Sequence, residues 1–209
     1  MVEERATLKP PTDLKQEQGC ILRNSTFGLV FCVLVLAAHR LVPLFFRLPG
    51  DDIASLLAFW SGSALLTVLW VLVGFSMVSR GRRRSLDDIR GSAFAPPSPR
   101  IAIHVAFLQN TVEQALMAVI VQIAVLLLAG AWTAPLVAGQ VLLFAVGRVT
   151  FLAGYPKGAG GRAFGLAVTA LPTLAGFVLA LWALVSSVAA SLSQSPSVRQ
   201  QPVEIARRE

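Results

Sequence analysis

Five long apolar blocks constrain the fold of this chain more than any other feature of its sequence. A transmembrane helix needs about 20 predominantly apolar residues, because each residue adds about 1.5 Å along the axis. The blocks lack the alternation of apolar and polar residues that a membrane β-barrel requires. Since a helix forms all the hydrogen bonds of its backbone N–H and C=O groups within its own segment, we expect an all-α integral membrane protein with five spans. The blocks are Thr26–Phe46, Ile53–Val78, Ile103–Gly130, Pro135–Gly154 and Ala163–Ala190.

Composition supports a lipid environment. Of the 209 residues, 55% are hydrophobic and 14% charged, with a mean hydropathy of +0.69, whereas soluble domains contain about 25% charged residues. The net charge of +7 comes from basic residues between the apolar blocks, which predicts contact with an anionic bilayer rather than with nucleic acid. The two cysteines form no metal-binding motif, so no metal site is expected.

Polar segments flank the apolar blocks. Residues 1–23 mix both charges with two adjacent prolines, which predicts a disordered tail and not a signal peptide. Residues 191–209 predict a second disordered tail, and Pro43 and Pro172 predict kinks in their helices. The connection from Ser79 to Arg100 holds six arginines and is expected in the cytoplasm, together with the N-terminal tail. An odd number of spans then leaves the C-terminal tail on the opposite side.

Two polar positions in the third block require a partner. Asn110 and Glu113 are three residues apart and share one helix face. A charged side chain facing lipid there would cost about 2.5–3.5 kcal/mol on insertion scales. Arg148 lies near the cytoplasmic end of the fourth block, at a similar depth. We therefore expect an Arg148–Glu113 pair.

A second polar group surrounds the turn between the fourth and fifth blocks. Tyr155 follows Arg148 by seven residues and lies on nearly the same face. Lys157, Arg162 and the free N–H groups at the start of the fifth helix predict a place for an anion. An alternative is that these polar residues only join helices, at about 0.6 kcal/mol each. In that case Arg162 only flanks the membrane on its cytoplasmic side.

The segments FLQNTVEQ and GRVTFLAGYPKGAGGRAFG resemble the two signatures of the MAPEG family. These are membrane-associated proteins in eicosanoid and glutathione metabolism, among them microsomal glutathione transferases. The pattern is Asn-x-x-Glu on one helix and, on the next, Arg, Tyr seven residues later, a glycine-containing turn and another Arg. Here those positions are Asn110, Glu113, Arg148, Tyr155 and Arg162.

This resemblance implies a four-helix membrane domain over residues 51–190, preceded by one extra N-terminal transmembrane helix over residues 24–50. It also implies a homotrimer that binds glutathione between subunits, on the cytoplasmic side. Asn110, Glu113, Arg148 and Tyr155 would bind glutathione. Tyr155 and Arg162 would be catalytic, Tyr155 by hydrogen bonding and Arg162 by stabilising the thiolate.

The expected activity is that of a glutathione transferase or peroxidase acting on a small lipophilic substrate from the bilayer. Active relatives carry basic residues just before the Asn, whereas this chain has Ala106, Phe107, Leu108 and Gln109. This segment and the extra N-terminal span are more similar to the mattrin branch of the family. The alternative is a non-catalytic trimeric membrane protein that uses the polar cluster for assembly, or to bind a lipid or thiol. The Arg-over-Lys composition favours a bacterial inner or plasma membrane over the endoplasmic reticulum.

Overall fold

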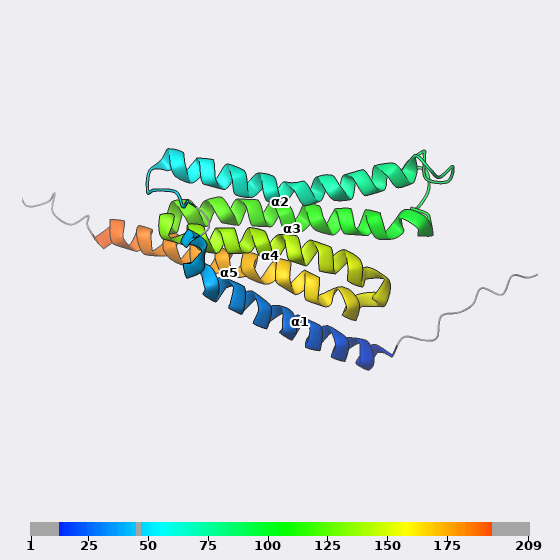
Figure 1. The fold of residues 1–209 in the computed structure, drawn as a ribbon, viewed down its shortest axis with the longest axis horizontal. Coiled ribbons are helices and arrows are strands. Elements are labelled where there is room, and N and C mark those ends of the chain that lie inside the picture. Colours follow the sequence, from blue (N-terminus) through cyan, green and yellow to red (C-terminus); the bar gives the residue numbers. More distant parts are fainter. Residues whose placement is uncertain (1–12, 45–46, 194–209) are drawn as a thin grey trace, which may run out of the picture.

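Long helices lying side by side make up the protein in a computed structural model that describes residues 13–44 and 47–193 (Figure 1). No strand occurs in these two segments. Short 3-10 turns, η1 (Ala38–Leu44), η2 (Ala131–Thr133) and η3 (Tyr155–Lys157), interrupt the helical chain. The α-helices are α1 (Leu14–Ala37), α2 (Ile53–Arg82), α3 (Pro99–Ala129), α4 (Ala134–Gly154) and α5 (Gly158–Ser193).

The helices have the length and composition of membrane spans. Four continuous helical runs within the described residues are long and apolar enough to cross a bilayer: 14–44, 53–82, 99–129 and 131–193. The last run has 63 residues and contains both α4 and α5, which fold back on each other at η3 (Figure 1). The prediction of an all-α integral membrane protein is therefore confirmed.

The helices follow a simple order across the bundle. α2 lies at one edge against α3, and α1 lies at the opposite edge against α5 (Figure 1). α4 and α5 occupy the middle, where α5 contacts α1, α3 and α4. The additional N-terminal helix thus covers the outer side of α5. It leaves most of α3 free of contact with α1.

The predicted disordered tails are shorter than expected. α1 begins at Leu14, so residues 14–23 are helical and the prediction of disorder is wrong for them. Asp13 caps this helix by accepting a hydrogen bond from the backbone N–H of Lys15, and contacts with α5 hold the segment in place. α5 likewise continues to Ser193. Residues 1–12 and 194–209, which hold the rest of both predicted tails, lie outside the described residues.

Glycines allow α4 and α5 to approach each other closely. A β-carbon at Gly165 would collide with the backbone of Gly147 and Phe151 on α4. A β-carbon at Gly154 would likewise collide with the backbone of Gly161. Close approach at small residues is a main way in which helices associate in lipid, where burial of apolar surface provides no driving force. This contact fixes the position of the α4 side chains relative to α5.

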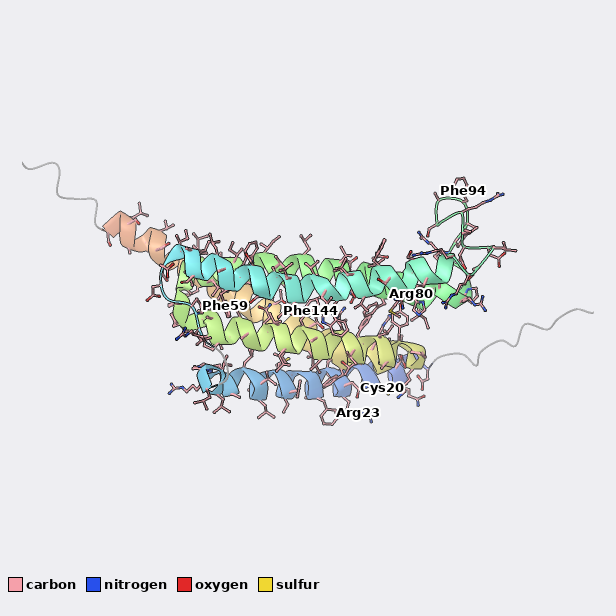
Figure 2. The ribbon with its side chains drawn as sticks, turned by 45° about the horizontal axis from the view of Figure 1, so that its top comes forward. Cys20, Arg23, Phe59, Arg80, Phe94 and Phe144 are labelled. Carbon is pink, nitrogen blue, oxygen red and sulfur yellow. The ribbon has the colours of Figure 1, made fainter. Side chains whose placement is uncertain are left out.

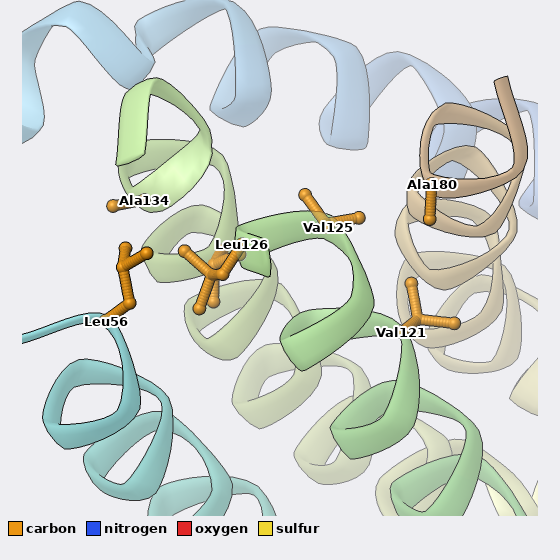
Figure 3. Packing of buried hydrophobic residues seen from close by; sticks show 7 residues of the cluster. Leu56, Val121, Val125, Leu126, Ala134 and Ala180 are labelled. Carbon is orange, nitrogen blue, oxygen red and sulfur yellow. The ribbon is translucent and has the colours of Figure 1, made fainter. Parts of the chain in front are cut away.

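A separate apolar core closes the end of the bundle away from η3. Leu56 of α2, Val125 and Leu126 of α3, Ala134 of α4 and Ala180 of α5 are buried there against one another (Figure 3). Gly130, at φ +96°, ends α3 beside this core and lets the chain enter η2. The core therefore joins four of the helices.

The other end of the bundle carries the basic residues. It contains the start of α1, the connection 83–98 between α2 and α3, and the η3 turn (Figure 1). We call it the basic end. Its arginines are those that predicted a cytoplasmic location for this side.

Candidate functional site

Arg148 is the central charged group inside the bundle. Its side chain is 0% exposed. Its Nη1 donates to Asn110 Oδ1 of α3 at 2.8 Å, and its Nη2 donates to Thr169 Oγ1 of α5 at 2.7 Å. The guanidinium also lies 5.5 Å from the ring centre of Phe144 and 4.8 Å from that of Phe151. Arg148 therefore connects α3, α4 and α5.

The expected pair between Arg148 and Glu113 is absent from the described residues, and that prediction is wrong. Glu113 Oε1 instead accepts a hydrogen bond from Gln109 Nε2 on the same helix, at 3.3 Å. The reason is rotation about the α3 axis. Asn110 faces Arg148 on α4, whereas Glu113, about 60° further round the helix, is turned outward and exposed.

Arg148 consequently has neutral partners only. Its two hydrogen-bond acceptors are an amide oxygen and a hydroxyl oxygen, and its Nε is buried without a hydrogen-bond partner. Burying a cation without a counterion is costly, and good hydrogen bonds offset only part of that cost. Because the acceptor of Asn110 is used by Arg148, the Nδ2 group of this amide remains available as a donor.

Glu113 and Gln109 form a polar patch on an apolar outer face of α3. Both are exposed, and the neighbouring Val112, Leu116 and Met117 are 44%, 62% and 46% exposed. A carboxylate on such a face would be in hydrocarbon if nothing covered it. The patch therefore requires water, a ligand or another protein chain beside it.

Aromatic rings connect Arg148 with the residues of the turn. The Phe151 ring, next to the Arg148 guanidinium, contacts the Tyr155 ring edge-on at 5.6 Å. The Arg162 guanidinium in turn lies 4.7 Å from the centre of the Tyr155 ring. Cations over aromatic faces are attracted by the ring quadrupole. Arg148, Phe151, Tyr155 and Arg162 thus form one continuous stack, and the structure brings three of the predicted residues together.

The predicted anion site at the start of α5 is occupied by the chain itself. Glu17 of α1 accepts a hydrogen bond from the backbone N–H of Gly160 at 2.9 Å. Asn24, two turns further along α1, donates to the carbonyl oxygen of Gly160 at 2.8 Å. A carboxylate at a helix N-terminus is favoured by the free N–H groups and the helix dipole. The expectation of a free site is therefore corrected, and Lys157 remains exposed beside it.

Two residues of the site were not predicted from the sequence. Phe151 lies three residues after Arg148 and four before Tyr155, so helix periodicity alone could have placed it between them. Thr169 lies seven residues after Arg162, on nearly the same face of α5. Its hydroxyl also donates to the carbonyl of Gly165 at 2.7 Å. The same hydroxyl thus links the Arg148 guanidinium to the backbone of α5.

Comparison with known proteins identifies one family. The MAPEG family model matches residues 57–182, which is more than half of the chain. The match covers every residue of the cluster around Arg148 and begins after α1. No curated protein and no solved structure matches the chain.

Proposed function

Because the chain belongs to the MAPEG family, we propose that it binds glutathione at a cytoplasm-facing site between the subunits of a homotrimer. The observation that carries this proposal is the polar patch of Gln109 and Glu113, exposed on an otherwise apolar face of α3. A neighbouring subunit would cover the apolar part of this face, and glutathione would contact the polar part.

The chemistry of the patch suits this ligand. Glutathione carries two carboxylates, one ammonium group and two amides. Glu113 offers a carboxylate for the ammonium group, and Asn110 offers its Nδ2 donor for a carboxylate or amide oxygen. Arg148 is enclosed, so we assign it a positioning role: it holds the Asn110 amide through the 2.8 Å bond and supplies positive potential behind it. Anionic ligands gain from such a potential in a medium of low polarity.

We further propose that the bound thiol reacts with a lipophilic electrophile or peroxide that enters from the bilayer. Tyr155 and Arg162 are stacked on each other, and no described residue hydrogen-bonds the Tyr155 hydroxyl or the Arg162 guanidinium. Arg162 would stabilise the thiolate, since a nearby cation lowers a thiol pKa from its free value of about 8.5. Tyr155 would donate a hydrogen bond. A bacterial inner or plasma membrane is the proposed location.

Two measurements on the purified protein test this proposal. Glutathione at about 100 times its dissociation constant should stabilise the folded protein by about 2.7 kcal/mol, visible as a rise in melting temperature. Conjugation of 1-chloro-2,4-dinitrobenzene should be lost in Arg162→Ala, while glutathione still stabilises that variant. Activity unchanged in Arg162→Ala would refute the catalytic role of Arg162. Absence of any melting shift would refute glutathione binding itself.

A second candidate function is a non-catalytic trimer that uses the cluster for assembly. It is favoured by Gln109, which stands where active relatives have a basic residue, and by the enclosure of Arg148 among side chains of its own subunit. Under this alternative Glu113→Leu should weaken the trimer, and no turnover should be measurable. A glutathione-dependent melting shift together with turnover would exclude it.

A further inference from the structure

A basic pocket lies outside the cluster around Arg148. It is formed at the basic end, between the last turns of α2 and the first turns of α3, and its volume is about 480 Å³. Arg80 and Phe94 mark this end of the molecule in Figure 2. The residues around the pocket are Met77, Arg80, Gly81, Arg84, Arg100, Ile101 and His104.

The pocket has three guanidinium groups and no acidic residue among its lining. Arg80 and Arg84 donate no side-chain hydrogen bond to any described residue, and Arg100 makes one long contact, 3.4 Å, to the carbonyl of Arg84. Other arginines of the same region are already engaged. Arg83 donates to Ser79 Oγ at 2.8 Å and Arg82 to Ser92 Oγ at 2.8 Å.

His104 adds an unused polar atom. Its Nδ1 is buried and has no hydrogen-bond partner in the described structure. An unpartnered buried polar atom is unfavourable, and a ligand in the adjoining pocket would offer it a partner. Asp88, an acidic residue of the connection 83–98, does not line the pocket and is bound to Ser98. Its two oxygens accept from the backbone N–H and hydroxyl of Ser98, at 2.8 and 2.6 Å.

Apolar side chains border the same region. Met77 lines the pocket itself, and Val73, one turn earlier on the same face of α2, is 36% exposed. In the connection 83–98, Leu86 is 91% and Phe94 78% exposed. A free anion gains nothing from contact with apolar side chains. A lipid whose headgroup enters the pocket would place its acyl chains against them, along the lipid-facing side of α2.

We infer that this pocket binds the phosphate-containing headgroup of an anionic phospholipid. The guanidinium groups would bind the phosphate oxygens in pairs, a geometry that arginine favours. The absence of acidic residues from the lining selects a lipid with net negative charge over a zwitterionic one, whose cationic group would meet the arginines. The site would fix the lipid at the surface of the bilayer that faces the basic end.

Lipid binding to the full-length protein in detergent tests this inference by native mass spectrometry and by melting temperature. The probes are dioleoyl phosphatidylglycerol, dioleoyl phosphatidylcholine with the same acyl chains, and inorganic phosphate alone. Phosphatidylglycerol should bind with one saturable site and raise the melting temperature. The double variant Arg80→Gln/Arg100→Gln should bind it about 25-fold more weakly, since each basic residue contributes about 1 kcal/mol, or about fivefold, near a membrane surface.

The matched control is Arg83→Gln, which removes a charge of the same region whose guanidinium is bound to Ser79 and does not line the pocket. It should change the affinity less than twofold. Equal weakening by Arg83→Gln and Arg80→Gln would overturn the inference, because it would show diffuse attraction instead of a site. Equal binding of phosphatidylcholine would overturn it too. Competition by inorganic phosphate at the same concentration as the lipid would identify a free-phosphate site and refute the lipid.

Discussion

The hydrogen bond between Arg148 and Thr169 gives the most direct test of how the bundle tolerates a buried cation. Thr169→Val keeps the shape of the side chain and removes the oxygen that Arg148 Nη2 contacts at 2.7 Å. The guanidinium would then keep Asn110 Oδ1 as its remaining described acceptor. Because Thr169 is 1% exposed, water cannot replace the missing oxygen without rearrangement.

The expected loss follows from the charge of the donor. Hydrogen bonds to charged groups contribute about 1.5–3 kcal/mol, against about 1 kcal/mol for neutral pairs. Thr169 also donates to the carbonyl of Gly165 on its own helix, and that bond is lost as well. Thr111 provides the matched control, since it is 0% exposed and donates to the carbonyl of Phe107 on its own helix, at 2.6 Å, and accepts no hydrogen bond from a cation among the described residues.

The difference between Thr169→Val and Thr111→Val therefore isolates the contact with the cation. We expect Thr169→Val to lower the free energy of unfolding by about 1.5–3 kcal/mol more than Thr111→Val. For a chain of this length that corresponds to a melting temperature lower by about 3–12 °C. The assay is thermal unfolding of both purified variants in the same detergent. Equal losses in the two variants would refute the reasoning, because Arg148 would then not depend on this oxygen.

Three further substitutions test other parts of the structure by thermal unfolding. Gly165→Ala should destabilise the protein by about 1–3 kcal/mol, because the added methyl group would collide with the α4 backbone. Glu17→Ala should lower stability by about 0.5–2 kcal/mol, because the N-terminus of α5 loses its capping carboxylate. Asp88→Asn should remove the loss of stability at acidic pH that comes from the Asp88 carboxyl. Hydrogen bonds from Ser85 and then Ser98 lower the pKa of the Asp88 carboxyl, so its contribution is present at neutral pH and is lost as the pH falls below about 4.

Each of these substitutions has a control of the same kind. Gly62 has nothing within 4 Å of an added β-carbon, so Gly62→Ala should be neutral or slightly stabilising. A cost as large as that of Gly165→Ala would contradict the close-approach argument. Gln16→Ala, at an exposed neighbour of Glu17, should have little effect. Asp51→Asn, at an exposed carboxyl, should leave the acid sensitivity of the wild type unchanged, and a loss there equal to that in Asp88→Asn would contradict the assignment.

The sequence alone was sufficient to predict the helical membrane fold. Apolar blocks of about 20 residues have one good solution in lipid, because a helix satisfies its backbone within the segment. The C-terminal end of α3 agrees with the predicted block Ile103–Gly130, since Gly130 directly follows the helix, whereas its start at Pro99 lies before the predicted Ile103. The start of α1 was not predictable. The segment 14–23 is rich in polar and charged residues and is not part of an apolar block. In the fold Glu17 and Asn24 bind the start of α5, which holds this segment in place.

Only part of the cluster around Arg148 could be predicted from the sequence, and its pairings could not. Spacing placed Asn110 and Glu113 on one helix face at the depth of Arg148, and in the structure Asn110, not the expected Glu113, bonds Arg148. The rotation of α3 turns Glu113 outward, and the close packing of α4 against α5 brings Thr169 to Arg148. Both depend on how the side chains of three helices pack. That packing is set by contacts between residues far apart in the chain, such as Gly147 with Gly165. Local periodicity carries no information about such contacts, so only the tertiary structure decided them.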